Sequence, residues 1–248
     1  MLKNILSGVK AYLGAFSLLS KLKLWKYFII PMLISLITAS GISIIAYNLS
    51  DNLGAYVSDL WIWDWGKSAF TTLGTILGLL IIIAIGIILF KHIVMAFSAP
   101  FMSPVSEKIE VYLTNNPNQN FTNNTFAQQL WRGIRINLRN LIRELLFTIP
   151  ILVLKFIPIV NIFSTILLFF LQSYYAGFGN MDYTLERHFN YKNSIKFVHE
   201  NRGLAIGNGI VFMLCLFIPF LGVILVLPLS VTAATTQTVK VLNQKLIQ

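Results

Sequence analysis

The sequence predicts an all-α integral membrane protein that forms a single membrane domain over residues 1–248. Of its 248 residues, 56% are hydrophobic and 11% are charged, whereas a soluble domain carries about a quarter charged residues. Two uncharged segments of twenty residues, 28–47 and 71–90, are each long enough to cross about 30 Å of hydrocarbon as a helix. Besides these two long transmembrane helices, we expect two proline-tipped helical hairpins that penetrate the membrane partly, and amphipathic interfacial helices.

Residues 1–27 are expected to form an amphipathic helix at the membrane interface. Apolar side chains recur there at three- and four-residue steps, for example at Ile5, Val9 and Phe16, which places them on one helical face. The segment has no continuous apolar core of the kind found in signal peptides. We therefore expect no cleaved leader.

The distribution of lysine and arginine predicts the orientation. Residues 1–27 carry five basic and no acidic side chains, residues 91–146 carry six against three, and residues 48–70 carry one against three. The positive-inside rule then places the N-terminus, the 91–146 segment and the C-terminal tail in the cytoplasm. Residues 48–70, which include three tryptophans, are expected to form an interfacial loop on the other side.

Residues 126–144 predict a basic amphipathic helix. Arg132, Arg135, Arg139 and Arg143 follow one another at steps of three, four and four residues, so they share one helical face. Two functions remain open for them. The arginines contact lipid phosphates, or they bind an anion or pair with carboxylates at the mouth of a pore, where a guanidinium offers a planar pair of donors.

Four further charged residues are candidates for a pore lining or for structural ion pairs. Glu107 and Glu110 lie three residues apart on one predicted helical face and are able to neutralise the arginines of 126–144; simple surface solvation is the alternative. Asp182 and Arg187 follow the first predicted hairpin. We expect these two to belong to a structural salt-bridge cluster.

Proline marks the tips of two expected hairpins, over residues 145–178 and 206–236. The motif Phe-Ile-Pro occurs at 156–158 and again at 217–219 within apolar stretches, and proline interrupts helical hydrogen bonding. The first arm, residues 145–157, measures about 20 Å as a helix, which is too short for a span. We therefore expect both hairpins to stop inside the membrane, and two pairs of ordinary short spans remain the alternative.

The sequence indicates no catalysis, no cofactor, no metal site and no nucleic-acid partner. Its three histidines stand outside metal-binding patterns, and it contains neither a glycine-rich phosphate loop nor a nucleophile elbow. His92, at the end of the second span, is expected at the membrane interface. The single cysteine, Cys215, excludes an intramolecular disulfide. We attribute the formal charge of +10 to cytoplasmic loops and to contact with lipid headgroups.

An ordered set of motifs along the chain resembles a known membrane protein family. The set is GAFSLLSKLKLWKYFIIP at 14–31, SAPFMSPVSEKIE at 98–110, the arginine helix, FIPIVNIF at 156–163, MDYTLERHF at 181–189 and FIPFLGVILVLPLSVTAAT at 217–235. Over roughly residues 7–240 it is similar to the bacterial CysZ sulfate permeases and the etoposide-induced membrane proteins. The resemblance implies two long spans, two partly penetrating hairpins, a homo-oligomer in the bacterial inner membrane, and inward transport of sulfate.

The resemblance also implies an anion site just before the first span, where the family carries a Gly-Leu-Arg-type motif that contacts sulfate. The aligned residues here are Lys23, Trp25 and Lys26, with Lys23 at the glycine position. Lysine keeps the charge but lacks the planar fork of arginine, and the loss of glycine limits how closely backbone N–H groups approach an oxyanion.

The expected anion-binding set therefore joins these three residues to Arg132, Arg135 and Arg139. The expected function is passive transport of sulfate or a similar oxyanion. The alternative is a membrane scaffold or lipid-remodelling protein without transport activity. Membrane lipids are expected partners in either case.

Overall fold

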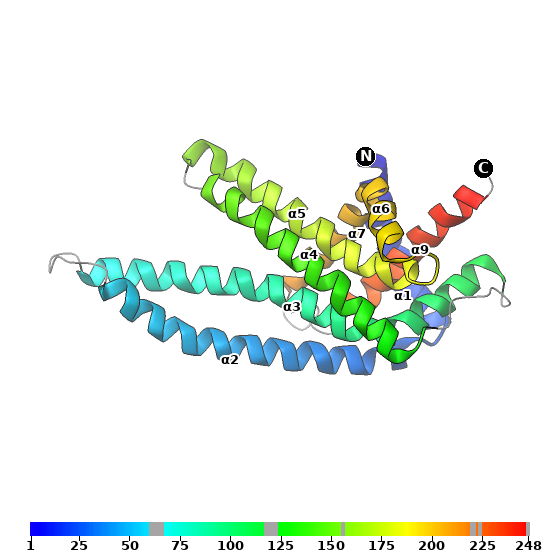
Figure 1. Ribbon diagram of the computed structural model, residues 1–248, viewed down its shortest axis with the longest axis horizontal. Coiled ribbons are helices and arrows are strands. Elements are labelled where there is room, and N and C mark those ends of the chain that lie inside the picture. Colours follow the sequence, from blue (N-terminus) through cyan, green and yellow to red (C-terminus); the bar gives the residue numbers. More distant parts are fainter. Residues whose placement is uncertain (60–66, 117–123, 155–156, 219–221, 223–224, 247–248) are drawn as a thin grey trace.

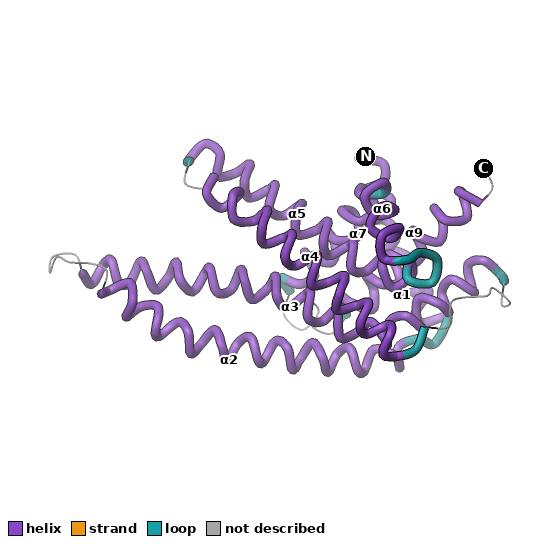
Figure 2. The backbone as a smooth tube through the Cα atoms, viewed as in Figure 1, coloured by secondary structure: helices purple, strands orange, loops and turns teal. Residues whose placement is uncertain are grey.

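The computed structural model describes residues 1–59, 67–116, 124–154, 157–218, 222 and 225–246. These residues form eight α-helices and one 3-10 helix, and they contain no strand (Figure 2). The elements are α1 (Leu2–Lys21), η1 (Trp25–Phe28), α2 (Ile29–Asp59), α3 (Lys67–Thr114), α4 (Phe126–Leu154), α5 (Pro158–Leu185), α6 (Tyr191–Glu200), α7 (Arg202–Leu216) and α9 (Val226–Leu246). The predicted all-helical fold class is confirmed.

The two long helices α2 and α3 run side by side and extend farthest from the rest of the molecule (Figure 1). Helix α3 contains the predicted span 71–90, and α2 contains the predicted span 28–47 except for Phe28, which belongs to η1. Both helices are longer than predicted, with 31 residues in α2 and 48 in α3. The predicted loop over 48–70 is wrong in its bounds, because α2 continues to Asp59 and α3 begins at Lys67. The tryptophans predicted for that loop, Trp61, Trp63 and Trp65, lie outside the described residues.

The predicted arginine helix and the first arm of the first hairpin are one continuous helix, α4. The predicted boundary between residues 144 and 145 does not exist, because the helix accommodates Pro150 within its length. Proline lies instead at the start of the next helix, since Pro158 occupies the first turn of α5, where a missing N–H costs little.

The second predicted hairpin corresponds to α7 and α9. Its tip residue, Pro219, lies outside the described residues. The depth to which either helix pair enters a membrane stays a prediction.

Three helical segments are long and apolar enough to cross a membrane, by length and composition, within the described residues. They are Trp25–Leu49, Ile85–Thr114 and Val160–Leu185. The third segment belongs to the returning arm of the first hairpin and has 26 residues, or about 39 Å as a helix. Arm length alone therefore no longer supports a partial depth for this hairpin.

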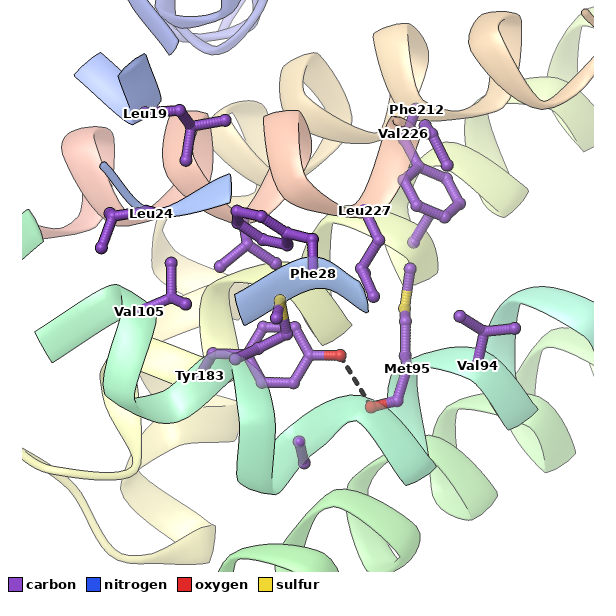
Figure 3. Packing of buried hydrophobic residues seen from close by; sticks show 14 of the residues in the cluster. Leu19, Leu24, Phe28, Val94, Met95, Val105, Tyr183, Phe212, Val226 and Leu227 are labelled. Atoms are coloured by element: carbon purple, nitrogen blue, oxygen red, sulfur yellow. Dashed lines mark hydrogen bonds between the residues drawn. The ribbon is translucent and has the colours of Figure 1, made fainter. Parts of the chain in front are cut away.

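A hydrophobic core joins the N-terminal helix to α3, α7 and α9 (Figure 3). Leu19, Leu24 and Phe28 are at most 1% exposed and pack with side chains of these helices. Tyr183 of α5 extends into the same core and donates from its hydroxyl to Met95 O at 2.7 Å. The core thus holds the start of the first span against the helices that carry the charged residues described below.

Glycine brings the two hairpins together. A Cβ added at Gly177 of α5 would overlap the carbonyl oxygen of Ala205, and one added at Gly209 of α7 would overlap that of Ser173. The backbones of α5 and α7 therefore touch, which is possible only where glycine supplies no side chain.

Candidate functional site

One face of α4 buries polar side chains, and another face exposes large apolar side chains. The buried polar positions recur at three- and four-residue steps and are Asn137, Asn140, Glu144 and Thr148. On the opposite side, Leu138, Ile142 and Leu146 are 52%, 50% and 62% exposed. This pattern is the reverse of an amphipathic helix in a soluble protein, and it suits a helix that separates lipid from a polar interior.

A first buried charge cluster connects α3 to α4. Lys91 Nζ lies 2.6 Å from Glu144 Oε1, and His92 Nε2 lies 2.9 Å from Glu144 Oε2. Lys91 and Glu144 are both 0% exposed, and Lys91 also donates to Gln172 O at 3.2 Å. A single buried charge at this position would be strongly unfavourable, so the cation and carboxylate are stable only as a hydrogen-bonded pair.

The predicted interfacial position of His92 is wrong. The side chain is 2% exposed, and its Nδ1 lies 3.4 Å from Asn137 Oδ1. The prediction assumed that the helix ends near Phe90, whereas α3 continues for another 24 residues. His92 is therefore in the middle of a helix that packs against α4.

A second buried cluster surrounds Arg187. Its Nη2 donates to Glu110 Oε2 at 3.0 Å, and its Nη1 donates to Ser106 Oγ and Tyr183 O at 2.8 Å each. His188 Nε2 lies 2.6 Å from the other oxygen of Glu110. Glu107 is exposed and makes no ion pair with any described residue. The two glutamates therefore differ in environment, although they are only three residues apart.

Arg132 forms a separate ion pair with Asp182. Its Nη2 donates to Asp182 Oδ1 at 2.9 Å and its Nε donates to Oδ2 at 3.1 Å. The same guanidinium donates to Phe189 O at 2.8 Å and to Ser194 Oγ at 2.6 Å. Asp182 and Arg187, which were expected in one cluster, thus have different partners five residues apart.

The two arginine clusters meet at a pocket of about 440 Å³. Arg132, Arg187 and His188 line it together with Glu186. Glu186 is 6% exposed, and its Oε1 has no hydrogen-bond partner within the described part of the chain. Burial and then the nearby carboxylate of Asp182 raise the pKa of Glu186 to about 8. At neutral pH this carboxyl is therefore mainly protonated and adds little negative charge to the pocket wall.

The lysine-tryptophan segment before the first span has the backbone of a helix terminus. Lys23 has a φ of 51°, and it follows α1 with Lys23 N donating to Ser20 O and Leu24 N donating to Leu19 O. This Schellman arrangement favours glycine at the left-handed position. Lys23 therefore occupies a backbone position that favours glycine, which is the residue type that the resemblance implies here.

The six expected anion-binding residues are not brought together. Lys26 lies beside Tyr27, whose hydroxyl accepts from Lys108 Nζ at 2.6 Å, whereas Glu110, two residues after Lys108, faces Arg187. The segment before the first span and the Arg187 cluster thus contact different faces of α3.

Among the remaining expected residues, Trp25 lies near α1. The three arginines, Arg132, Arg135 and Arg139, lie on α4. Trp25 packs edge-on against Phe16 at 5.2 Å between ring centroids. Arg135 lies 4.1 Å from the ring centroid of Tyr191. Arg139 lines a different pocket from Arg132.

Sequence reasoning missed the pair of Lys91 and Glu144. Both residues stand at the border of long apolar runs, where a charge reads as the end of a span rather than as its interior. The available signal was the spacing of Asn137, Asn140, Glu144 and Thr148, which marks one polar face on a helix whose other face is apolar.

Comparison with known proteins assigns the family. Curated proteins give no match to the chain. Residues 11–227 match the family described as sulfate transporter CysZ/etoposide-induced protein 2.4. The matched region runs from α1 to the first turn of α9 and includes every buried ion pair described above. The chain therefore belongs to the CysZ/etoposide-induced protein 2.4 family.

Proposed function

We propose that the protein is a passive pathway for sulfate or a similar oxyanion, through the polar interior bounded by α3, α4 and α5. The observation that carries this proposal is a set of buried donors without a hydrogen-bond partner among the described residues: Ser98 Oγ, Ser103 Oγ, Asn140 Nδ2 and Thr148 Oγ1. A buried polar group without a partner costs about 1–3 kcal/mol. Hydrogen bonds from these groups to water or to a passing anion would remove this cost. Membership of a family that includes a sulfate transporter supports transport as the activity.

The arrangement of charges suits movement better than tight binding. An oxyanion that leaves water needs many donors, none of which holds it too strongly. Among the described residues of this interior, the buried cations already have carboxylate partners, as Lys91 has Glu144 and Arg187 has Glu110. The carboxylates keep the interior neutral when it is empty, and they compete with a bound anion, so an oxyanion at Arg187 or Lys91 is readily released.

The same proposal includes the environment of the protein. We place it in the bacterial inner membrane as a homo-oligomer, with both termini in the cytoplasm. The positive-inside count supports the orientation, and the family resemblance supports the membrane and the assembly.

A pair of isosteric variants tests the transport pathway. Thr148→Val removes a buried hydroxyl without a partner, whereas Thr165→Val removes an exposed one that donates to Asn161 O at 2.9 Å. In proteoliposomes loaded with radiolabelled sulfate, we expect Thr148→Val to reduce flux about fivefold or more and Thr165→Val to leave it unchanged. Thermal unfolding should show Thr148→Val to be at least as stable as the wild type, because a desolvated polar group is lost. Equal flux in the two variants contradicts this pathway.

The alternative function, a membrane scaffold or lipid-remodelling protein, is favoured by one observation. Helix α1 exposes large apolar side chains, with Leu2 at 77% and Leu13 at 85% exposure, as expected for a helix that inserts into a membrane surface. The same proteoliposomes separate the two functions. Wild-type sulfate flux equal to that of protein-free liposomes, together with altered vesicle shape, would establish the scaffold.

A further inference from the structure

A basic pocket separate from the polar interior lies between α4, α5 and α6. It has a volume of about 370 Å³. Its cationic side chains include Arg139 and Arg143 from α4 and Lys192 and Lys196 from α6. The two members of each pair are four residues apart, so one turn of each helix supplies two positive charges to the same pocket.

These four cations form no ion pair with any residue that the structure describes. Glu200 is the acidic residue in the wall of the pocket, so positive charge predominates. Burial and then the neighbouring Arg143 lower the pKa of Arg139, which indicates repulsion between the two guanidiniums. An anion in the pocket would relieve this repulsion and accept charge-assisted hydrogen bonds from both.

The pocket borders an apolar surface that faces away from the protein. Leu138, Ile142 and Leu146 are at least 50% exposed, and on an α-helix they lie beside the stripe formed by Arg139 and Arg143. Helix α6, which supplies the lysines, is short and largely polar on its exposed side. Cations between an apolar surface and a polar helix are typical of a protein at the level of lipid headgroups.

We propose that this pocket binds the phosphate group of an anionic phospholipid, whose acyl chains lie along Leu138, Ile142 and Leu146. A phosphate presents the paired oxygens that an arginine fork recognises. A free inorganic oxyanion shares this chemistry, but it has no apolar part to pack against the adjoining apolar surface. The site lies outside the interior pathway and does not depend on transport.

The test is lipid binding by the purified full-length protein in detergent, measured by native mass spectrometry. The probes are dioctanoyl phosphatidylglycerol and dioctanoyl phosphatidylcholine, with inorganic phosphate titrated by calorimetry. We expect the anionic lipid to bind about tenfold or more tightly than the zwitterionic one. Arg139→Gln/Arg143→Gln and Lys192→Gln/Lys196→Gln should each weaken binding of the anionic lipid about tenfold. The lysine variant changes exposed positions of α6, so it tests the pocket even if the arginine variant fails to fold.

A matched control removes the same charge from another basic pocket. Lys3 and Lys10 of α1 line a pocket of about 410 Å³ that also includes Lys240, and Lys3→Gln/Lys10→Gln should leave lipid binding unchanged. Unchanged lipid binding in the α4 and α6 variants, or an equal loss in the control, would overturn the proposal. So would binding of inorganic phosphate as tight as that of the lipid. Because flux is not measured, failure of the transport pathway would leave these results unaffected.

Discussion

At the residue scale, Lys23 shows how a helix terminus holds a residue with a side chain in a backbone conformation that favours glycine. Its φ of 51° lies in the left-handed region, which costs a residue with a Cβ about 1–2 kcal/mol relative to a right-handed conformation. The hydrogen bonds of the helix end and the buried contacts of Leu19 and Leu24 hold it there. Lys23 thus places a positive charge just before the first span, and its backbone is strained as a result.

Lys23→Gly should therefore stabilise the protein by about 0.5–1 kcal/mol, because glycine removes the strain while it raises the entropy of the unfolded chain. Thermal unfolding in detergent measures the gain as a higher Tm. Lys23→Ala separates the two properties of the residue, since it removes the charge and keeps the strain. A Tm that rises equally for alanine and glycine would attribute the effect to charge.

Because of Glu186, the free energy of unfolding should decrease as pH rises. Burial raises its folded pKa to about 8 from a reference value of 4.5. Between these two values the unfolded state loses the proton and the folded state retains it, so deprotonation favours unfolding. Stability should decrease between pH 4.5 and 8 by up to about 1.4 kcal/mol per pH unit and then level off.

Glu186→Gln isolates this contribution, because glutamine has a similar shape and does not ionise. The difference in Tm between variant and wild type should be near its minimum at pH 5 and should increase in favour of the variant toward pH 8. A difference that does not change with pH would show that Glu186 ionises normally in the folded protein.

At the element scale, close backbone contact decides how the helices assemble. Helices α5 and α7 touch at Gly177 and Gly209, where an added Cβ would meet a carbonyl oxygen rather than a movable side chain. The periodicity of apolar residues locates both helices, but it does not show which glycine of a membrane helix lies in a contact. The inward polar face of α4 is equally hard to assign from sequence. In a membrane protein the apolar face of a helix is able to face lipid, so a polar face is not necessarily the exposed one.

Gly177→Ala should destabilise the protein by about 1–3 kcal/mol or more, since neither backbone is able to yield without moving its helix. Gly14→Ala is the control. No atom lies within 4 Å of an added Cβ at Gly14, so alanine should stabilise α1 by about 0.5–1 kcal/mol. Thermal unfolding of both variants should give Tm shifts of opposite sign, and a lowered Tm in both would mean that the effect is not specific to the α5–α7 contact.

At the scale of the whole molecule, the two helix pairs extend to different distances. The adjoining ends of α4 and α5 lie well short of the adjoining ends of α2 and α3 along the long axis of the molecule (Figure 1). The depth to which the α4–α5 hairpin enters a membrane stays a prediction, because its returning arm contains a segment long and apolar enough to cross.

We expect a cysteine at position 157, beside the α4–α5 tip, to be protected from an impermeant thiol reagent added outside intact cells. The variant is Ile157→Cys in a Cys215→Ser background. Ser68→Cys, at the exposed start of α3, serves as the accessible control in the same background. Labelling of both cysteines at equal rates would show that the α4–α5 hairpin crosses the membrane completely.

The sequence by itself determined the helical membrane class, the two long apolar helices and the family, because these depend on uncharged length and on motif order along the chain. It also located the arginine helix and drew attention to Arg132, Arg187, Glu110 and Asp182, which the structure places in ion pairs. Only the tertiary structure decided their partners, since a helix has several faces and a contact such as Arg132 with Asp182 joins residues fifty positions apart.

The same limit explains the interior pair of Lys91 and Glu144. Lys91 directly follows the second expected span and Glu144 directly precedes the first expected hairpin. Only the packing of α3 against α4 removes both from water and brings them within 2.6 Å. A charge near an apolar run is stable either in water or beside an opposite charge. The local sequence is compatible with both, so the choice between them is made by the fold.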